Sequence, residues 1–223
     1  PRSTLFPYTT LFRSGLRANC LVMIGRYRWL TLVTIWLLSA ALGAERLQEG
    51  DLIFHNSQSR QSKAIRQVTG SDLTHVGILV RARGQLMVAE ASGAVQVTPV
   101  SDFIARGRGG KYLVKRLQGG LTPHQLKKMR EVGLTFLGLP YDRLFLWDDA
   151  SIYCSELVWK IYQRGAGIRL GEPQTFGSLD LSSSEAQMLL SERLGRRPVP
   201  NQEPIVTPVA LARCSKLRVV LQR

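Results

Sequence analysis

The chain has 223 residues, enough for one sizeable domain with a full hydrophobic core. Its formal net charge is +14, from 30 Lys and Arg against 16 Asp and Glu. Such an excess suits an anionic surface, for example a membrane, a cell-wall polymer or a nucleic acid. However, the basic residues are spread along the chain and no nucleic-acid-binding motif accompanies them. We therefore favour an ordinary solvated basic surface and expect no nucleic-acid partner, leaving open peripheral association with an anionic membrane.

The first 22 residues are interpreted as a sequence artefact. Residues 4–14 (TLFPYTTLFRS) resemble the in-frame translation of a common sequencing-library adapter. We therefore expect neither fold nor function from residues 1–22, Cys20 included, and interpret Met23 as the natural start.

A secretory signal is predicted at residues 23–44. Two arginines precede an apolar run at Trp29–Leu38, and the small residues of Ser39–Ala44 follow it. The apolar run is shorter than a membrane-spanning helix requires, and no cysteine follows for lipid anchoring. We expect a signal peptide cleaved near Gly43–Ala44 and export to the periplasm of a bacterium, with an uncleaved N-terminal anchor as the alternative.

Residues 45–223 are predicted to form one α+β domain whose first half is rich in strands. Apolar and alternating runs predict strands at residues 51–55, 75–82, 85–91, 95–100 and 111–117. Arg83-Gly84 supplies a turn, so the second and third of these strands are expected to form a hairpin in which residue 82 pairs with residue 85. Residues 57–68 are polar with scattered apolar positions, which predicts a helix or structured loop over a cleft.

The second half of the domain is predicted to be mainly helical. Thr122-Pro123 is a strong helix start, and this helix runs to about Leu137. A second helix is predicted over Asp149–Gly165, with Asp149 or Ser151 as its cap. The remaining elements are a short helix at residues 185–194, one helical turn at 208–213 and a last strand at 217–221.

Cys154 lies in the first turn of the predicted helix over residues 149–165. Unpaired N–H groups and the positive end of the helix dipole favour the nucleophilic thiolate there. A small buried hydrophobe is the alternative role for a lone cysteine. Pairing with Cys214 in an oxidising compartment would also make it structural. Neither cysteine has His or acidic partners at metal-ligand spacing, so we predict no metal site and no cofactor.

A nucleophilic cysteine needs a base for its proton and a third group that holds the base. Three histidines are available. We favour His75, which opens a central strand, over His55, which ends the first one. His124 falls in the first turn of a polar helix and is expected to be exposed. A satisfied, half-buried structural histidine is the alternative interpretation of His75.

Glu90 is the predicted orienting group. If residue 82 pairs with residue 85, position 75 opposes position 92, and Glu90 is then a diagonal neighbour of His75 on the same face. A one-residue slip of the register would break this arrangement. A solvated acid at a strand end is the alternative.

Five features of the sequence carry a resemblance to a known family: GDLIF (50–54), THVGI (74–78), Glu90, PYD (140–142) and YCSELVWKIY (153–162). Together they resemble the YiiX/YebB-like family of permuted papain-fold cysteine hydrolases, over about Gln48–Leu221. This family belongs to the NlpC-type superfamily, alongside the lecithin retinol acyltransferase group. It implies a circularly permuted papain-like fold, because the histidine strand precedes the cysteine helix. An antiparallel sheet or partial barrel would pack on that helix.

The resemblance also implies site roles. Cys154 would be the nucleophile, His75 the general base and Glu90 the orienting group. Tyr141 is expected to line the cleft with its hydroxyl near the oxyanion, whose main donor would be the backbone N–H of Cys154. His55 could act as a second histidine, as in the acyltransferase relatives.

Three functions stay open at this point. The leading one is an exported cysteine amidase or peptidase that acts through an acyl-enzyme, on cell-wall peptides such as peptidoglycan. The second is a lipid esterase or acyltransferase, which the positive charge keeps open. The third is a binding module, against which an intact Cys/His/Glu set argues. The polar segment at residues 57–71, with Arg60, Lys63 and Arg66, slightly favours an anionic or peptide ligand over an acyl chain.

Overall fold

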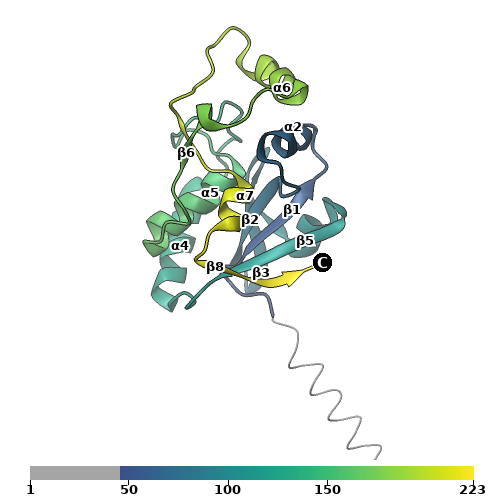
Figure 1. Ribbon diagram of the computed structural model, residues 1–223. Helices are drawn as coiled ribbons and strands as arrows, with labels where there is room; N and C mark the ends of the chain where they lie inside the picture. Colours follow the sequence, from purple (N-terminus) through teal and green to yellow (C-terminus); the bar gives the residue numbers. More distant parts are fainter. Residues whose placement is uncertain (1–45) are drawn as a thin grey trace, which may run out of the picture. The chain divides into compact units, whose positions relative to one another are not determined.

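A six-stranded antiparallel sheet forms the centre of residues 46–223, the part of the chain that the computed structural model describes (Figure 1). Its strand order is β4-β3-β2-β1-β5-β8, and β4 and β8 lie at its two edges, so the sheet is open and not a closed barrel. The strands are β1 (Leu52–Ser57), β2 (His75–Ala82), β3 (Gln85–Ser92), β4 (Ala94–Pro99), β5 (Gly107–Leu117) and β8 (Leu217–Gln222).

Residues 1–45 include both the predicted adapter-derived segment and the predicted signal, which therefore lie outside the described residues. Within residues 46–223, no helix combines the length and the apolar character needed to cross a membrane.

Both faces of the sheet are covered, which explains the continuous apolar run of β1. Leu52 and Phe54 pack into the larger core cluster, together with the buried side chains of the cysteine helix. Ile53 points to the opposite face, where Phe103 of the short helix α3 (Val100–Ala105) joins a second cluster. A strand that is buried on both sides needs apolar residues at successive positions, because side chains alternate between the two faces.

The hairpin of β2 and β3 has the predicted register. Ala82 pairs with Gln85 and Ile78 with Ala89. The two turn residues, Arg83 and Gly84, have positive φ angles of 50° and 79°, as a tight two-residue hairpin turn requires. This register places the later residues of β3 beside the start of β2.

The helices agree with the predicted set except at the start of the cysteine helix and at α3, which was not predicted from the sequence. Helix α4 (Pro123–Phe136) begins with the expected cap, because the Thr122 side chain accepts from the Gln125 amide. The cysteine helix α5 spans only Cys154–Ile161, and a π-helical turn, Tyr162–Ala166, extends it.

The predicted cap of α5 at Asp149 or Ser151 is wrong, because Tyr153 is the N-cap residue. The preceding residues are extended: the Ile152 amide donates to the Pro140 carbonyl at 3.1 Å. The Asp149 carboxylate binds Lys160 at 2.9 Å instead of capping the helix. Cys154 is therefore the first residue of the helix.

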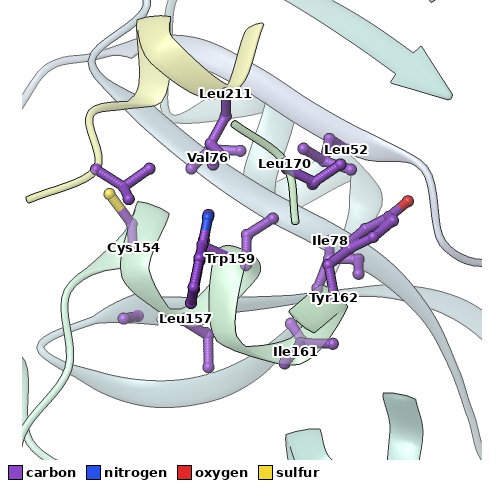
Figure 2. Packing of buried hydrophobic residues seen from close by; sticks show 14 of the residues in the cluster. Leu52, Val76, Ile78, Cys154, Leu157, Trp159, Ile161, Tyr162, Leu170 and Leu211 are labelled. Carbon is purple, nitrogen blue, oxygen red and sulfur yellow. The ribbon is translucent and has the colours of Figure 1, made fainter. Parts of the chain in front are cut away.

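Helix α5 is almost wholly buried against the sheet. Figure 2 shows Leu157 and Ile161 of α5 and Tyr162 of the π turn in one cluster with Ile78 of β2, and the Cys154 sulfur at the start of the helix. Gly165 lets the π turn lie directly against α4, because a Cβ there would come within 2.6 Å of the Met129 Cα. The nucleophile's helix is thus fixed on two sides.

A second group of elements covers one end of the sheet. Helices α2 (Arg60–Thr69) and α6 (Ser184–Leu194) pack against each other, and Figure 1 shows them together at the end away from β8. Helix α2 forms within the segment predicted as a helix or loop, and the expected elements at residues 185–194, 208–213 and 217–221 are confirmed as α6, α7 and β8. The other short elements are β6 (Gln174–Thr175), a 3₁₀ turn (Phe176–Ser178), β7 (Pro204–Ile205) and α7 (Pro208–Arg213).

Candidate active site

Cys154 lies at the N-terminus of α5 with its side chain buried. The amides of the first turn of a helix have no partners within the helix, so they form a positive environment around the sulfur. Both Cys154 and Cys214 are free thiols, and Cys214 lies at the end of α7. The alternative of a disulfide between them is thus not the arrangement in this structure.

His75 is the first residue of β2, and it hydrogen-bonds the carboxylate of Glu90. The His75 Nε2 atom lies 2.7 Å from Glu90 Oε2, and Glu90 is fully buried. The pair follows directly from the confirmed hairpin register. With Nε2 bound to Glu90, Nδ1 is the ring nitrogen left to exchange a proton with a thiol.

Two further side chains hold the Glu90 carboxylate, and neither was predicted. Thr98 of β4 donates from Oγ1 to Glu90 Oε1 at 2.6 Å, and Arg106 forms an ion pair with the same oxygen. Thr98 is a diagonal neighbour of Glu90 in the β3–β4 pair, in which Glu90 opposes Gln96. The alternation of β4 could have indicated Thr98, whereas Arg106 follows α3 and carries no signal in the sequence. The result is a carboxylate with every oxygen bound.

The pKa values of these groups favour a thiolate–imidazolium pair. Burial opposes the charge on His75, but the Cys154 thiolate and the hydrogen bonds to Cys154 and Glu90 outweigh it and raise the pKa of His75 to about 9. Burial raises the pKa of the Cys154 thiol, but the charge and the hydrogen bond of His75 lower it by more, so the net effect is a lowered pKa. Burial also opposes the charge on Glu90, but His75, Thr98 and Arg106 bring its pKa down to about 2. His75 and Glu90 are therefore charged near neutral pH, and the Cys154 thiol ionises more readily than an isolated thiol.

His55 lies beside His75 but is not part of the polar chain. Their rings are 5.2 Å apart, and the edge of the His55 ring meets Phe103 at 4.5 Å. Neither ring nitrogen of His55 has a hydrogen-bond partner among the described residues, and the residue is 2% exposed. Burial and then the charge of His75 lower the pKa of His55 to about 4, so it is neutral at pH 7.

Tyr141, the other tentative site residue, lies close to Cys154. Its backbone forms a bridge to Ile152, just before α5. The Tyr141 hydroxyl accepts a hydrogen bond from Gln61 Nε2 at 3.0 Å, and Gln61 in turn binds Arg193 of α6. Burial and the Cys154 thiolate raise the pKa of Tyr141, so the hydroxyl keeps its proton. Gln61 and Arg193 were not predicted from the sequence.

Two hollows meet at these groups. We call the first the apolar pocket; it is a narrow space of about 70 Å³. Its lining consists mostly of apolar side chains, namely Ala64, Ile65, Val68, Thr69, Tyr141, Phe145, Tyr153, Cys154, Ser155, Phe176, Leu179, Leu181, Ala186, Leu189, Leu190, Ile205, Val206, Thr207 and Pro208.

We call the second hollow the polar cleft; it is wider, about 870 Å³. It is lined by His55, Ser57, Gln58, Ser59, Gln61, His75, Ala91, Ser92, Gly93, Ala105, Arg106, Pro140, Tyr141, Arg143 and Arg193. Of the reactive pair, Cys154 lines the apolar pocket and His75 lines the polar cleft, while Tyr141 lines both.

The charged residues of α2 do not line either hollow, which corrects one expectation. Lys63 pairs with Glu185 at 2.6 Å and Arg66 with Asp72 at 2.8 Å, both on the exposed side of the helix. The opposite side of α2 contributes Ala64, Ile65 and Val68 to the apolar pocket. In the sequence, these basic side chains slightly favour an anionic or peptide ligand over an acyl chain, but they line neither the apolar pocket nor the polar cleft.

Comparison with known proteins finds a matching family, a relative and a similar crystal structure. The family described as "Permuted papain-like amidase enzyme, YaeF/YiiX, C92 family" matches residues 46–221. The uncharacterized protein YiiX of Escherichia coli strain K12 is 42% identical over 189 residues, which covers 85% of this chain and 93% of that protein. The crystal structure of the metalloprotein yiiX from Escherichia coli O157:H7 superposes with a TM-score of 0.76 at 43% identity, over 79% of this chain and 97% of that one. The predicted permuted papain-like α+β fold is confirmed.

Proposed function

Because the chain belongs to the permuted papain-like amidases of the YaeF/YiiX family, which are cysteine hydrolases, we propose that it cleaves an amide bond through an acyl-enzyme on Cys154. His75 acts as general base and then general acid, and Glu90 holds its ring. The observation that carries this proposal is the 2.7 Å hydrogen bond between buried Glu90 and His75, beside a thiol at the start of a helix.

The reaction follows from the resting ion pair. The Cys154 thiolate attacks the carbonyl carbon and forms an S–C bond. The amide C–N bond then breaks, and the amine leaves with the proton from His75 Nδ1. In the second half, water attacks the thioester and gives a proton to His75, the S–C bond breaks, and the thiolate is restored. Glu90 stabilises the imidazolium throughout.

The developing oxyanion has two donors in this arrangement. The first is the backbone N–H of Cys154, because the opening residue of α5 has no partner for its amide within the helix. The second is the Tyr141 hydroxyl: Gln61 donates to its oxygen, which leaves the phenolic proton for the substrate. Tyr141 is thus proposed as an oxyanion donor and Gln61 as the residue that positions it.

A metal ion has no part in this mechanism. The similar crystal structure is described as that of a metalloprotein. In this chain, however, residues 46–223 bring no three His, Cys, Asp or Glu side chains together in a way that could hold a metal ion. The donor set of the site therefore does not fit a metal centre, and no step is assigned to one.

On the substrate, we propose amides with a peptide-like amine component, with peptidoglycan peptides as the leading source and an exported location as the setting. The serine, glutamine and arginine side chains of the polar cleft support a hydrophilic component of this kind. A second candidate, hydrolysis or transfer of lipid esters, is favoured by the apolar pocket that opens at Cys154. Both candidates share the acyl-enzyme.

The test is to trap that intermediate. Wild-type protein mixed with a chromogenic acyl anilide and quenched within milliseconds to seconds should carry one acyl group on Cys154, detected by intact-protein and peptide mass spectrometry. Cys154→Ala should carry none, and His75→Ala should form it far more slowly. A wild-type protein that binds such amides but never acquires the acyl mass would instead support the binding-module alternative.

A further inference from the structure

We propose that the buried ion pair of Glu156 and Lys160 positions the oxyanion site. It fixes the segment that precedes Cys154, and this sets the distance between the two proposed donors, the Cys154 amide and the Tyr141 hydroxyl. The inference rests on the proposed acyl-enzyme chemistry and adds two positioning residues to it. Neither residue lines the apolar pocket or the polar cleft.

The two residues lie one turn apart on α5, inside the protein. Glu156 Oε1 lies 2.6 Å from Lys160 Nζ, and the side chains are 0% and 2% exposed. The sequence neighbours of Lys160, Trp159 and Ile161, belong to the core cluster (Figure 2). Burial raises the pKa of Glu156 to about 7, although Lys160 and the Tyr153 amide favour its charged form. An ion pair buried at this cost contributes little to the stability of the fold, so its presence calls for another role.

Glu156 holds the residue directly before the nucleophile. Its Oε2 atom accepts a hydrogen bond from the Tyr153 amide at 3.3 Å. The Ile152 amide, one residue earlier, donates to the Pro140 carbonyl at 3.1 Å. The next amide along the chain is that of Cys154, which starts the helix and has no partner within it. The two bound amides therefore fix the direction in which the Cys154 amide points.

Lys160 holds the other end of the same segment. Besides Glu156, its Nζ atom binds the Asp148 carbonyl at 2.6 Å and Asp149 Oδ1 at 2.9 Å. Three oxygens around the ammonium group match its three N–H donors. Residues 148–153 are therefore tied to α5 at both ends.

The middle of this segment supports the second donor. Tyr141 and Ile152 form a parallel β-bridge, and the Asp142 amide donates to the Ile152 carbonyl at 3.2 Å. A shift of residues 148–153 against α5 would therefore move the Tyr141 hydroxyl relative to the Cys154 amide. Oxyanion donors act at about 2.7–3.1 Å from the charged oxygen, and a misplacement of about 1 Å can be costly.

The acid–base groups of the site lie on other elements. His75 and Glu90 belong to β2 and β3. Neither member of the ion pair is among the main groups that shift the pKa of His75 or Cys154. The ionisation of Cys154 should therefore survive the loss of the ion pair, whereas stabilisation of the oxyanion should not. A merely structural role would not separate these two properties.

The experiment compares two reactions of Cys154 in the full chain, in wild type and Lys160→Met. Alkylation by iodoacetamide forms an S–C bond, expels iodide and develops no oxyanion, so its rate at pH 7 should stay within about twofold of wild type. The second probe is the aldehyde that matches the acyl anilide. The thiolate adds to its carbonyl carbon, the oxygen takes the negative charge, and His75 then supplies a proton to complete a thiohemiacetal.

The affinity for this aldehyde is measured by its protection of Cys154 against iodoacetamide. We expect it to fall about 10- to 100-fold in Lys160→Met, together with kcat/KM on the anilide, against the roughly 10²- to 10³-fold loss when an oxyanion donor is deleted. Lys127→Met is the matched control, because it breaks the exposed pair of Lys127 and Glu131 at the same helical spacing on α4. This control should change neither reaction.

Two further variants separate positioning from stability. The double variant Glu156→Gln/Lys160→Met leaves no buried charge without a partner, so its Tm should recover toward that of wild type. Its aldehyde affinity should nevertheless stay low, because residues 148–149 remain released from α5. Asp149→Ala changes a side chain that is 52% exposed and removes one acceptor from Lys160. It should lower the aldehyde affinity about three- to tenfold.

The outcomes distinguish this inference from the proposed function. If the double variant regains wild-type aldehyde affinity along with its Tm, the ion pair only stabilises the fold and the inference is wrong. If alkylation slows as much as the aldehyde affinity falls, the pair acts on the thiolate, and the inference is also wrong. If the wild type binds the aldehyde but no amide ever acylates Cys154, the proposed amidase function fails, while the aldehyde affinities of the variants still decide the positioning role.

Discussion

Two histidine environments lie side by side in this sheet and have opposite properties. His55 and His75 are register partners in the β1–β2 pair, and their rings are 5.2 Å apart. Both are buried, yet the pKa of His75 is raised to about 9 and that of His55 is lowered to about 4.

Because both rings are buried, the difference between the two pKa values comes from the groups that surround each ring. His75 has a carboxylate on one side and a thiolate on the other, and each favours the imidazolium. For His55, burial and the positive charge of His75 outweigh the weaker opposing effects of the Asn56 backbone and Glu90. Neither of its ring nitrogens has a hydrogen-bond partner with good geometry among residues 46–223. Burial alone lowers the pKa of a histidine, so the ring is neutral at pH 7. Two anionic partners can raise the pKa above 7 despite burial, so the ring keeps its second proton.

Removal of each ring gives the largest expected contrast. His75→Ala should lower kcat/KM on an acyl anilide by about 10³-fold, because a general base contributes roughly 10² to 10⁴. His55→Phe keeps a ring against Phe103 and should change kcat/KM by less than about tenfold. Steady-state kinetics checks both variants. Equal losses in the two would contradict the different roles assigned to them.

The second effect comes from the carboxylate that holds His75. Glu90→Gln keeps the shape of the side chain but removes its charge, so we expect a loss of about 10²-fold in kcat/KM. The pH profile should also move. In the wild type, activity rises as the Cys154 thiolate forms and falls as His75 loses its proton near pH 9. In Glu90→Gln the alkaline fall should occur at lower pH, and an unmoved profile would contradict an orienting charge at Glu90.

The third effect is a pH dependence of the free energy of unfolding that His55 causes. Its pKa is about 4 in the folded chain against 6.5 when unfolded, so the unfolded chain takes up a proton first as pH falls through this window. The free energy of unfolding should therefore fall between pH 6.5 and pH 4, with about 2 kcal/mol lost at pH 5 from this group. Urea titrations of wild type and His55→Phe at pH 7 and pH 5 measure it. The variant should lose about that much less, and His124→Gln should behave like the wild type.

The smallest effect is expected at Arg106, which binds Oε1 of Glu90, the carboxylate oxygen that does not contact His75. Its side chain is 40% exposed, so solvent screens much of its charge. Arg106→Gln should raise the pKa of Glu90 from about 2 and lower kcat less than about tenfold, without moving the alkaline limb that His75 sets. Kinetics between pH 4 and pH 9 checks this. A loss as large as that of Glu90→Gln would make Arg106 a full partner in the orienting group.

Local signals in the sequence were enough to place His75 beside Glu90. The turn at Arg83-Gly84 sets the hairpin register, and the register sets the pair. The start of α5 was placed too early because Asp149 and Ser151 are good caps in isolation. The extended pairing of Ile152 with Pro140 depends on a contact that only the fold creates.

The apolar pocket was missed for a similar reason. Its walls come from α2, from the residues around Tyr141, from α5 and α6, and from the chain before α7. None of these segments shows a binding motif by itself. The sequence of α2 is mostly polar, so its few apolar residues did not indicate that one side of the helix lines a pocket. Arg106, Gln61 and Arg193 reach the site from separate elements in the same way, so only the assembled structure connects them to the chemistry.

The central claim is that His75 is charged and His55 neutral in the same buried pair of strands. Nitrogen-15 NMR of the imidazole rings between pH 4 and pH 10 tests it directly, with assignments from His55→Phe and His124→Gln. We predict that both ring nitrogens of His75 carry protons at pH 7 and that one is lost near pH 9, while His55 takes up a second proton only near pH 4. A neutral His75 at pH 7 would contradict the ion pair, and with it the resting state from which the proposed hydrolysis begins.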